Sequence, residues 1–268
     1  MKQALTIAGS DSGGGAGIQA DLKTFHAHGV FGTSVLTAIT AQNTVAVTDA
    51  FELPPELINT QIDAVFGDFD IAAAKTGMLS SAAIVDTVAA ALRRRRFERL
   101  VVDPVMISKS GYKLLKDDAI ESLKSLLLPL ALLVTPNIHE AQLLADIEID
   151  SPDAMRDAAR RIGEYGPRNV LVKGGHAGFD RATDVLFDGD DFHLFESRYI
   201  ETKNLHGTGC TFSAAIAARI ALGEPLTTAI ANAKTYITNA IEQSLDIGKG
   251  HGPTNHFYFL SPDDFKTD

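Results

Sequence analysis

The chain has 268 residues, of which 45% are apolar and 22% are charged, and its formal net charge is −10. This composition is typical of a globular enzyme built around one hydrophobic core, and it excludes disordered and fibrous classes of protein. The acidic balance excludes an extended nucleic-acid surface, because binding along a phosphate backbone needs clustered Lys and Arg. The single cysteine, Cys210, excludes an intrachain disulfide and indicates a reducing, cytoplasmic compartment.

The N-terminus carries about six mildly apolar residues before glycines begin, which is too few for a signal peptide or a membrane span. Short β-branched runs then alternate with amphipathic stretches, and neither a linker nor a repeat interrupts them, which predicts a single domain over residues 1–268. Parallel strands need crossover helices, so this alternation predicts a three-layer α/β/α fold with a central, mostly parallel sheet and no separate lid domain. The predicted strands are Leu5–Ala8, Thr33–Thr40, Ile71–Lys75, Leu100–Val102, Leu132–Thr135, Val170–Val172 and Thr183–Phe187. The predicted helices are Ile18–His28, Glu56–Phe66, Ala82–Arg93, Ala119–Leu127 and Asp153–Glu164.

Three local patterns refine this outline. The segment Phe187–Phe192 predicts a hairpin with its turn at Asp188–Asp191, because Asp-Gly favours tight turns. From Thr208 to about Leu245 we expect two helices, interrupted at Gly223-Glu-Pro225. The basic run Arg93–Arg96 favours a solvated helix end over an interaction patch, because cations stabilise helix C-termini.

Ligands of open α/β sheets bind beyond the carboxyl ends of the strands, and the first polar loop there is glycine-rich. Gly9–Gly17 directly follows the first predicted strand, so its backbone can approach a ligand closely, and the following helix offers amide groups at its start. The spacing matches neither the dinucleotide fingerprint nor the P-loop. Both a ligand-facing loop and a simple strand-to-helix turn fit this pattern.

Polar side chains follow the ends of four further predicted strands. Gln42 offers an amide that suits the edge of an aminopyrimidine, or that caps its own loop. Asp103 can hold Mg²⁺ through water, since Mg²⁺ gives up its hydration reluctantly. Asn137 and Glu140 can point to the same side and serve the same ion, or they can form a helix cap and its answering acid. Lys173 is costly to bury alone, which favours contact with a phosphate or a carboxylate.

The segment Gly207-Thr208-Gly209-Cys210 leads into a long apolar helix. Successive amides at Gly209 and Cys210 can converge on one anion, as phosphoryl transfer requires. A helix N-terminus lowers the pKa of a thiol, so we expect partial thiolate character at Cys210. A lone cysteine is ordinarily an inert core residue, but its position directly behind Gly-Thr-Gly favours a place beside the transferred phosphate.

Together these segments resemble the hydroxymethylpyrimidine/phosphomethylpyrimidine kinases of thiamin biosynthesis, within the ribokinase-like superfamily. The resemblance runs from residue 8 to residue 253 and is specific in combination. The matching segments are AGSDSGGGAGIQADLKTF, TAQNT, KTGML, DPVM, TPNIHEA, VKGGH, NLHGTGCTFSAA and GKGHGP.

The resemblance implies that ATP, with Mg²⁺, phosphorylates 4-amino-5-hydroxymethyl-2-methylpyrimidine and then extends the monophosphate to the diphosphate. It assigns the anion hole to Gly207, Thr208 and Gly209. It places Cys210 beside the acceptor hydroxyl, where most of the superfamily has an aspartate base. The pyrimidine pocket would be lined by Gln42, Gly9, Ala16, Asp21, Met78 and Val105. The ATP and Mg²⁺ site would comprise Lys173, Asn137, Thr208, Glu140 and Asp103, the carboxylates acting through water.

Two alternatives stay open at this point. One is a pyridoxal or pyridoxine kinase of the same fold, although such kinases tend to carry Met where this chain has Gln42. The other is a catalytically silent pyrimidine-binding protein. We further expect a flap over the phosphates at Ile107–Leu115, with Ser108, Ser110 and Gly111 in it. The partners would be the pyrimidine and ATP, without nucleic acid or membrane, in a chain that can act as a homo-oligomer such as a dimer.

Overall fold

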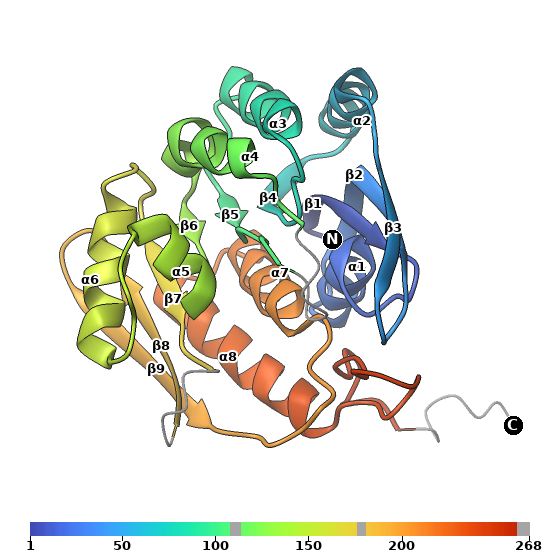
Figure 1. The fold of residues 1–268 in the computed structure, drawn as a ribbon. Coiled ribbons are helices and arrows are strands. Elements are labelled where there is room, and N and C mark those ends of the chain that lie inside the picture. Colours follow the sequence, from blue (N-terminus) through green and yellow to red (C-terminus); the bar gives the residue numbers. More distant parts are fainter. Residues whose placement is uncertain (108–113, 176–180, 262–268) are drawn as a thin grey trace, which may run out of the picture.

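A computed structural model describes residues 1–107, 114–175 and 181–261. A nine-stranded sheet runs through the molecule in the order β3-β2-β1-β4-β5-β6-β7-β8-β9 (Figure 1). The strands from β2 to β7 are parallel, and antiparallel pairs extend both edges. The mostly parallel sheet is therefore confirmed. Its strands are β1 (Gln3–Asp11), β2 (Phe31–Gln42), β3 (Val47–Glu52), β4 (Ile71–Thr76), β5 (Leu100–Val102), β6 (Leu133–Val134), β7 (Val170–Lys173), β8 (Arg181–Phe187) and β9 (Phe192–Arg198).

Helices cover both faces of this sheet, as the crossover connections require (Figure 1). One apolar core lies under α2 to α6, and the other lies under α1, α7 and α8. Successive residues of a strand point to opposite faces, so Leu5 and Ile7 enter the first core while Ala4 enters the second. The three-layer α/β/α fold is confirmed. Its helices are α1 (Gly17–Ala27), α2 (Pro55–Asp68), α3 (Ala82–Arg94), α4 (Asp117–Ser122), α5 (Ile138–Ala145), α6 (Pro152–Gly163), α7 (Thr208–Ala221) and α8 (Leu226–Glu242).

The local predictions are also confirmed where the structure describes them. The helix predicted to end in the arginine run is α3, which ends at Arg94 with exposed arginine side chains at its terminus. β8 and β9 form the expected hairpin, closed by the amide of Asp188 donating to the carbonyl of Asp191 at 3.2 Å. The break between α7 and α8 falls at residues 222–225.

Two elements differ from the prediction. The edge strand β3 was not predicted, because four of its six residues are exposed and no apolar run marks it. The predicted helix Ala119–Leu127 is divided into α4 and a π-helical turn, Leu123–Leu127. In the described part of the chain, no helix is both long and apolar enough to cross a membrane.

Candidate active site

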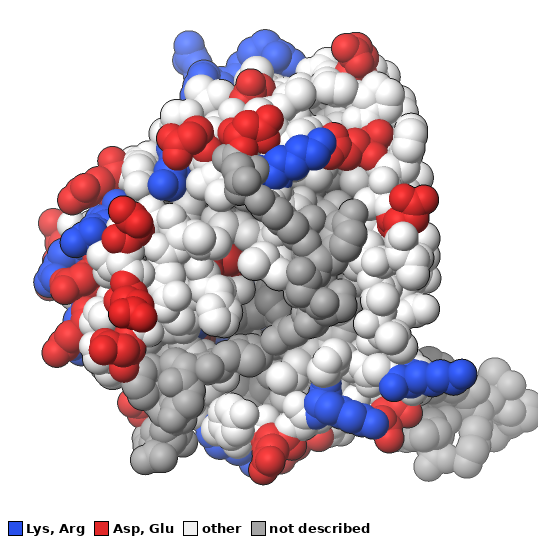
Figure 2. All heavy atoms as spheres, in the orientation of Figure 1, with Lys and Arg blue, Asp and Glu red and all other residues white. Residues whose placement is uncertain are grey.

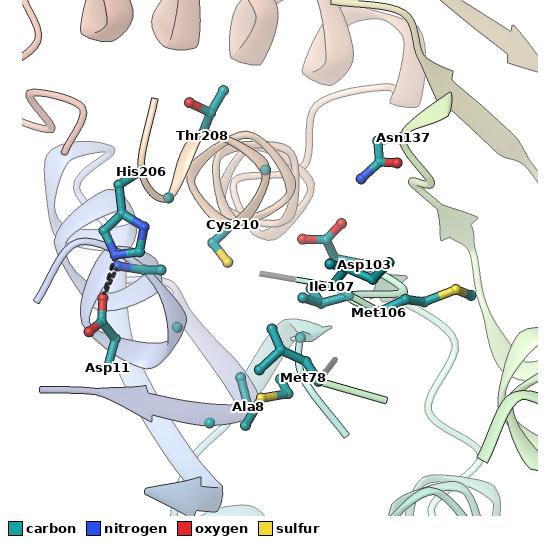
Figure 3. Close-up of a pocket in the computed structure, with 18 of the residues that line it drawn as sticks. Ala8, Asp11, Met78, Asp103, Met106, Ile107, Asn137, His206, Thr208 and Cys210 are labelled. Carbon is teal, nitrogen blue, oxygen red and sulfur yellow. Dashed lines mark hydrogen bonds and ion pairs between the residues drawn. The ribbon is translucent and has the colours of Figure 1, made fainter. Parts of the chain in front are cut away.

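Most of the predicted site residues surround one cavity of about 400 Å³ at the carboxyl ends of the parallel strands (Figure 3). Charged side chains of the described residues lie mainly toward the periphery of this face (Figure 2). Figure 3 shows Cys210 at the start of α7, with its sulfur pointing into the space between Met78 and Asp103. The cavity is lined by every predicted site residue except Asp21: Gly9, Ala16, Gln42, Met78, Asp103, Val105, Asn137, Glu140, Lys173, Gly207, Thr208, Gly209 and Cys210.

Asp21 is not part of the cavity wall, and its predicted place in the pocket is wrong. Its carboxylate is fully buried and accepts hydrogen bonds from Thr6 at 2.6 Å and from Lys75 at 3.0 and 2.9 Å. Burial acts to lower the pKa of Lys75, but the charge of Asp21 raises it well above its ordinary value. Lys75, which lines the cavity, is therefore a cation beneath the pocket, and Asp21 is its counter-ion.

The glycine-rich loop folds around a carboxylate of its own chain. Asp11 accepts hydrogen bonds from the amides of Gly13, Gly15 and Ala16 at 2.8, 3.0 and 2.8 Å, and from His206 Nε2 at 2.8 Å. Burial acts to raise the pKa of Asp11, but His206 and the loop amides hold it below its ordinary value. These three amides are thus already paired within the loop, so they are not offered to a phosphate.

The turn at Gly207 sets the entry of α7 into the site. Gly207 adopts φ +79° as the N-cap of α7, and a Cβ there would overlap the carbonyl oxygen of Gly15. Glycine is required on both counts. The amides of Gly209 and Cys210 lie in the first turn of the helix, where no intrahelical acceptor exists, and they border the cavity. This arrangement suits an anion, as predicted.

The thiol of Cys210 is not the partial thiolate that the helix N-terminus predicts. Burial raises the pKa of Cys210 to about 11, although the Lys75 ammonium acts in the opposite direction. The negative charges of Asp21 and Asp103 add to the rise. At neutral pH the side chain is therefore a neutral thiol, and desolvation outweighs the helix terminus.

Lys173 lies at the end of β7, and its amine donates to Asp103 Oδ1 at 2.8 Å. The Lys173 and Asp103 side chains are 12% and 2% exposed, so the pair is nearly dry. Burial acts to raise the pKa of Asp103, but Lys173 and Lys75 hold it below its ordinary value. The lysine thus has a protein partner, and its remaining N–H groups are available to a phosphate.

Asn137 and Glu140 form the capping box of α5. The Asn137 side chain accepts from the amide of Glu140 at 3.0 Å, and Glu140 Oε2 accepts from the amide of Asn137 at 2.8 Å. The structural reading of this pair is therefore confirmed, while both residues also line the cavity. Burial raises the pKa of Glu140 to about 7, against the attraction of Lys173.

A second cavity, of about 300 Å³, adjoins the first. Its far wall is formed by β9, the following segment, α7 and α8, with Ile200, Phe212, Ile237 and Ile241 as apolar surface. A buried ion pair, Lys234 to Asp184 at 2.7 Å, closes its base. Six residues line both cavities: Asn137, His139, Lys173, Leu205, Thr208 and Gly209. Lys173, Thr208 and Gly209 therefore belong to a wall shared by the two cavities.

The cavity wall also includes residues that were not predicted as site residues, among them Asp11, Thr40, Lys75 and His206. Lys75 lies in the KTGML segment and His206 precedes Gly207, so both stand in segments that carry the resemblance. Their partners are 54 and 195 residues away in sequence, which no local pattern reveals. Of the predicted flap, Ile107, Leu114 and Leu115 are described, and Ser108, Ser110 and Gly111 lie outside the described residues.

Comparison with known proteins agrees with this geometry. The sequence profile described as phosphomethylpyrimidine kinase matches residues 11–255. The hydroxymethylpyrimidine/phosphomethylpyrimidine kinase of Haemophilus influenzae is 50% identical over 97% of this chain and 98% of its own length. The thiamine biosynthesis bifunctional protein ThiED of Geobacter sulfurreducens is 54% identical over 94% of this chain, which spans 51% of that protein.

Among solved structures, the ADP complex of Bacillus subtilis pyridoxal kinase superposes with a TM-score of 0.90 and 38% identity. The match covers 97% of this chain and 98% of the other, and it confirms the ribokinase-like fold. The profile and the full-length relative, taken with the two compartments that meet at the Gly207–Cys210 turn, establish that the chain belongs to the phosphomethylpyrimidine kinase family.

Proposed function

We propose that the chain transfers the γ-phosphoryl group of ATP to the hydroxymethyl group of 4-amino-5-hydroxymethyl-2-methylpyrimidine, and then a second one to the resulting monophosphate. The observation that carries this proposal is the wall shared by the two cavities, which contains Lys173, Thr208 and Gly209. A phosphoryl donor on one side and an acceptor on the other would meet there. Phosphoryl transfer depends chiefly on such positioning and on stabilising the charge of the transferred group.

The nucleotide belongs in the second cavity. Its apolar wall of Phe212, Ile237 and Ile241 suits the faces of a purine base, and Lys173 stands at its junction with the first cavity. From there the phosphates can reach the amides of Gly209 and Cys210. These donors are fixed by the helix before the ligand arrives, so they stabilise the transferred group without reorganising.

The acceptor belongs in the first cavity, where Gln42, Met78 and Val105 line the wall. Cys210 faces this space as a neutral thiol, so it shapes the acceptor site and is a weak base. A weak base suffices, because phosphoryl transfer makes little demand for early deprotonation of the alcohol. The second acceptor is a phosphate, already anionic, and a neutral thiol avoids repelling it as a carboxylate would.

Two carboxylates fit the requirements of Mg²⁺. Asp103 and Glu140 both line the first cavity, and the charge of Asp103 adds to the effect of burial in raising the pKa of Glu140. Mg²⁺ is typically held by one or two carboxylates together with water and substrate phosphates. Among the described residues no cluster of three or more His, Cys, Asp or Glu could hold a metal alone, which agrees with such a water-mediated site. The ion would neutralise phosphate charge during transfer.

The pyrimidine is favoured over pyridoxal as acceptor by Gln42, whose amide offers both a donor and an acceptor to the ring edge. The name of the Haemophilus relative, at 50% identity, points to the same substrate. We further propose one kinase domain working in the cytoplasm, which the free thiol of Cys210 supports. We also propose that the chain can form a homo-oligomer such as a dimer, which light scattering would test.

A single coupled assay tests the proposal. The purified protein is given ATP and Mg²⁺ with either the hydroxymethylpyrimidine or pyridoxal, and ADP release is followed while the products are weighed by mass spectrometry. We expect clear preference for the pyrimidine and the addition of two phosphates in succession. A preference for pyridoxal would sink the assignment of Gln42, and binding without ADP release would indicate a silent binder.

A further inference from the structure

The Asp11 carboxylate determines where His206 carries a hydrogen. Asp11 is 3% exposed, and His206 Nε2 lies 2.8 Å from its Oδ2 (Figure 3). The loop amides that bond the same carboxylate mark it as an anion. A nitrogen lone pair pointing at a carboxylate oxygen would be repelled, so His206 Nε2 bears a hydrogen and donates it to Asp11. This holds for the neutral and the protonated ring alike.

Thr40 fixes the other side of the Gln42 amide. Its hydroxyl oxygen lies 2.9 Å from the carbonyl oxygen of Ser10 and 3.1 Å from one end of the Gln42 amide. A hydroxyl has one hydrogen to give. The carbonyl of Ser10 can only accept, so it takes that hydrogen, and Thr40 can then only accept from Gln42. The end of the amide beside Thr40 is therefore the NH₂ group.

The opposite end of the same amide lies 3.4 Å from His206 Nε2. An NH₂ group there would face the N–H of His206, which sets one donor against another. The oxygen and nitrogen of an amide have nearly the same shape, so the surrounding hydrogen bonds decide which is which. With the nitrogen of Gln42 toward Thr40 and the oxygen toward His206, Thr40 accepts from the amide, and the oxygen lies beside the hydrogen that His206 gives to Asp11, so no two donors face each other.

We propose that Asp11, His206 and Thr40 are positioning residues that hold the Gln42 amide in this one orientation, and that they thereby decide which hydrogen-bonding pattern the acceptor pocket admits. The proposal rests on the proposed function. Gln42 keeps one N–H and one oxygen lone pair for a ligand, with the acceptor on the His206 side and the donor on the Thr40 side. Both neighbours line the same cavity as Gln42.

This order of donor and acceptor also explains how the hydroxymethyl group would reach the transferred phosphate. In the 4-aminopyrimidine, the amino group is a donor and the adjacent ring nitrogen is an acceptor, so the amino group would lie toward His206. The ring carbon that bears the hydroxymethyl group is the other ring neighbour of the amino-bearing carbon, so the hydroxymethyl group lies further toward that side. His206 directly precedes the turn from Gly207 to Cys210. A reversed amide would carry the hydroxymethyl group away from that turn.

A pair of substrates and three variants test the proposal. The 4-oxo analogue of the pyrimidine carries its ring hydrogen on the nitrogen next to the carbonyl, so its donor and acceptor are exchanged. We expect the wild-type chain to prefer the 4-amino compound by at least about 100-fold in kcat/KM, since sites built for a hydrogen bond reject ligands that leave it unpaired. Thr40→Val should reduce this preference at least about tenfold, and Thr40→Ser should retain it.

The control is Thr33→Val, which lies on the same strand β2 and also removes a hydroxyl bonded to a backbone carbonyl, that of Ala4 at 3.1 Å. It should leave the preference unchanged. An unchanged preference in Thr40→Val, with the 4-amino compound still turned over, would overturn the proposal while leaving the proposed function intact. A wild-type chain that phosphorylates pyridoxal and neither pyrimidine would overturn both.

A spectroscopic measurement keeps the proposal testable if Thr40→Val does not fold. The ¹⁵N spectrum of the imidazole groups in the wild-type chain, with His206 assigned through His206→Met, should show a hydrogen on Nε2. In Asp11→Asn this hydrogen should no longer be held there. A neutral His206 with its hydrogen on Nδ1 in the wild-type chain would overturn the proposal.

Discussion

Lys75 donates to both carboxylate oxygens of Asp21, at 3.0 and 2.9 Å, and neither side chain has any exposed surface. Removing one member of such a pair leaves the other charged and unsolvated, whereas removing both is often neutral. Lys75 also lines the first cavity, so its charge contributes to the electrostatic potential there. The pair therefore has separable effects on stability and on activity.

We expect Asp21→Asn to lower the free energy of unfolding by about 3–5 kcal/mol, measured by urea denaturation. The double variant Asp21→Leu with Lys75→Met should recover most of that loss but should phosphorylate more slowly than the wild-type chain. Asp157→Asn is the matched control, because its ion pair with Arg160 is 64% and 56% exposed and should contribute about 0–1 kcal/mol. A double variant with wild-type kcat would show that Lys75 is purely structural.

Cys210 should behave as a half-buried, neutral thiol. With its pKa raised to about 11, only about one molecule in ten thousand carries the thiolate at pH 7. Alkylation by iodoacetamide should therefore be slow at pH 7 and should accelerate up to about pH 11. Fast alkylation at neutral pH would contradict this.

The Cys210→Ala variant should lower phosphorylation of the alcohol more than phosphorylation of the monophosphate. The alcohol must lose a proton during transfer, whereas the monophosphate is already anionic. The measurement is kcat for each acceptor in the same assay. Equal losses on both acceptors would show that Cys210 acts by shape alone.

Glu140 should make folding stability depend on pH. Its folded pKa of about 7 lies above its ordinary value of 4.5, so the folded state binds the proton more tightly than the unfolded state. The associated stability is fully present below about pH 4.5 and is lost as the pH rises to about 7, amounting to about 3 kcal/mol. Glu140→Gln keeps the capping box and should lack this loss, so the two chains should diverge in unfolding free energy above pH 5.

The control for this measurement is Glu56→Gln, since Glu56 is an exposed acid in the first turn of α2. It should follow the wild-type pH dependence. Saturating Mg²⁺ and ATP should lower the pKa of Glu140, because a cation beside it favours the carboxylate. Parallel pH profiles for the wild-type chain and Glu140→Gln would contradict the assignment.

The glycines that flank α7 at its two ends offer a matched pair of substitutions. Gly207 and Gly223 both adopt positive φ, +79° and +92°, so alanine costs roughly 1–2 kcal/mol of strain at either. At Gly223 a Cβ meets nothing within 4 Å, whereas at Gly207 it overlaps the backbone of Gly15. Gly207→Ala should therefore abolish most activity and cost more stability than Gly223→Ala, which should remain active. Equal effects of the two substitutions on thermal unfolding and on turnover would be evidence against a required close contact between Gly207 and the backbone of Gly15.

Gln42→Met should weaken binding of the pyrimidine by about 1–3 kcal/mol, the cost of leaving a buried polar partner unsatisfied. Isothermal titration with the hydroxymethylpyrimidine measures this directly. Binding of pyridoxal should weaken less. A variant that still binds the pyrimidine with wild-type affinity would show that Gln42 does not recognise the pyrimidine ring.

Much of the fold could be predicted from the sequence because buried parallel strands consist of short runs rich in β-branched residues. The predicted strand Leu100–Val102 has the same first and last residues as β5, because this segment is apolar throughout and buried on both faces of the sheet. β3 was missed because it is an edge strand that faces solvent. The positions that follow strand ends could also be predicted, and all but one of the predicted site residues line the cavity.

What the sequence could not reveal was electrostatic environment. The pKa of Cys210 is governed by burial and by Lys75, Asp21 and Asp103, which come from three separate elements. Its position behind Gly-Thr-Gly predicted correctly that the residue lies in the first turn of a helix, where it lines the cavity, but predicted the wrong charge. Asp21 lies one turn into α1 and reads as a plausible pocket residue, until the packing of β4 against β1 brings Lys75 onto it.

The contact between Asp11 and His206 joins residues that are 195 positions apart. During synthesis the glycine-rich loop leaves the ribosome early, and the turn that completes it follows only after most of the chain has been made. The nascent protein can therefore begin to form its sheet while its reaction centre is still missing. Catalytic competence would arrive late in translation, and a truncated product that ends before α7 would retain strands of the scaffold while lacking the proposed centre of phosphoryl transfer.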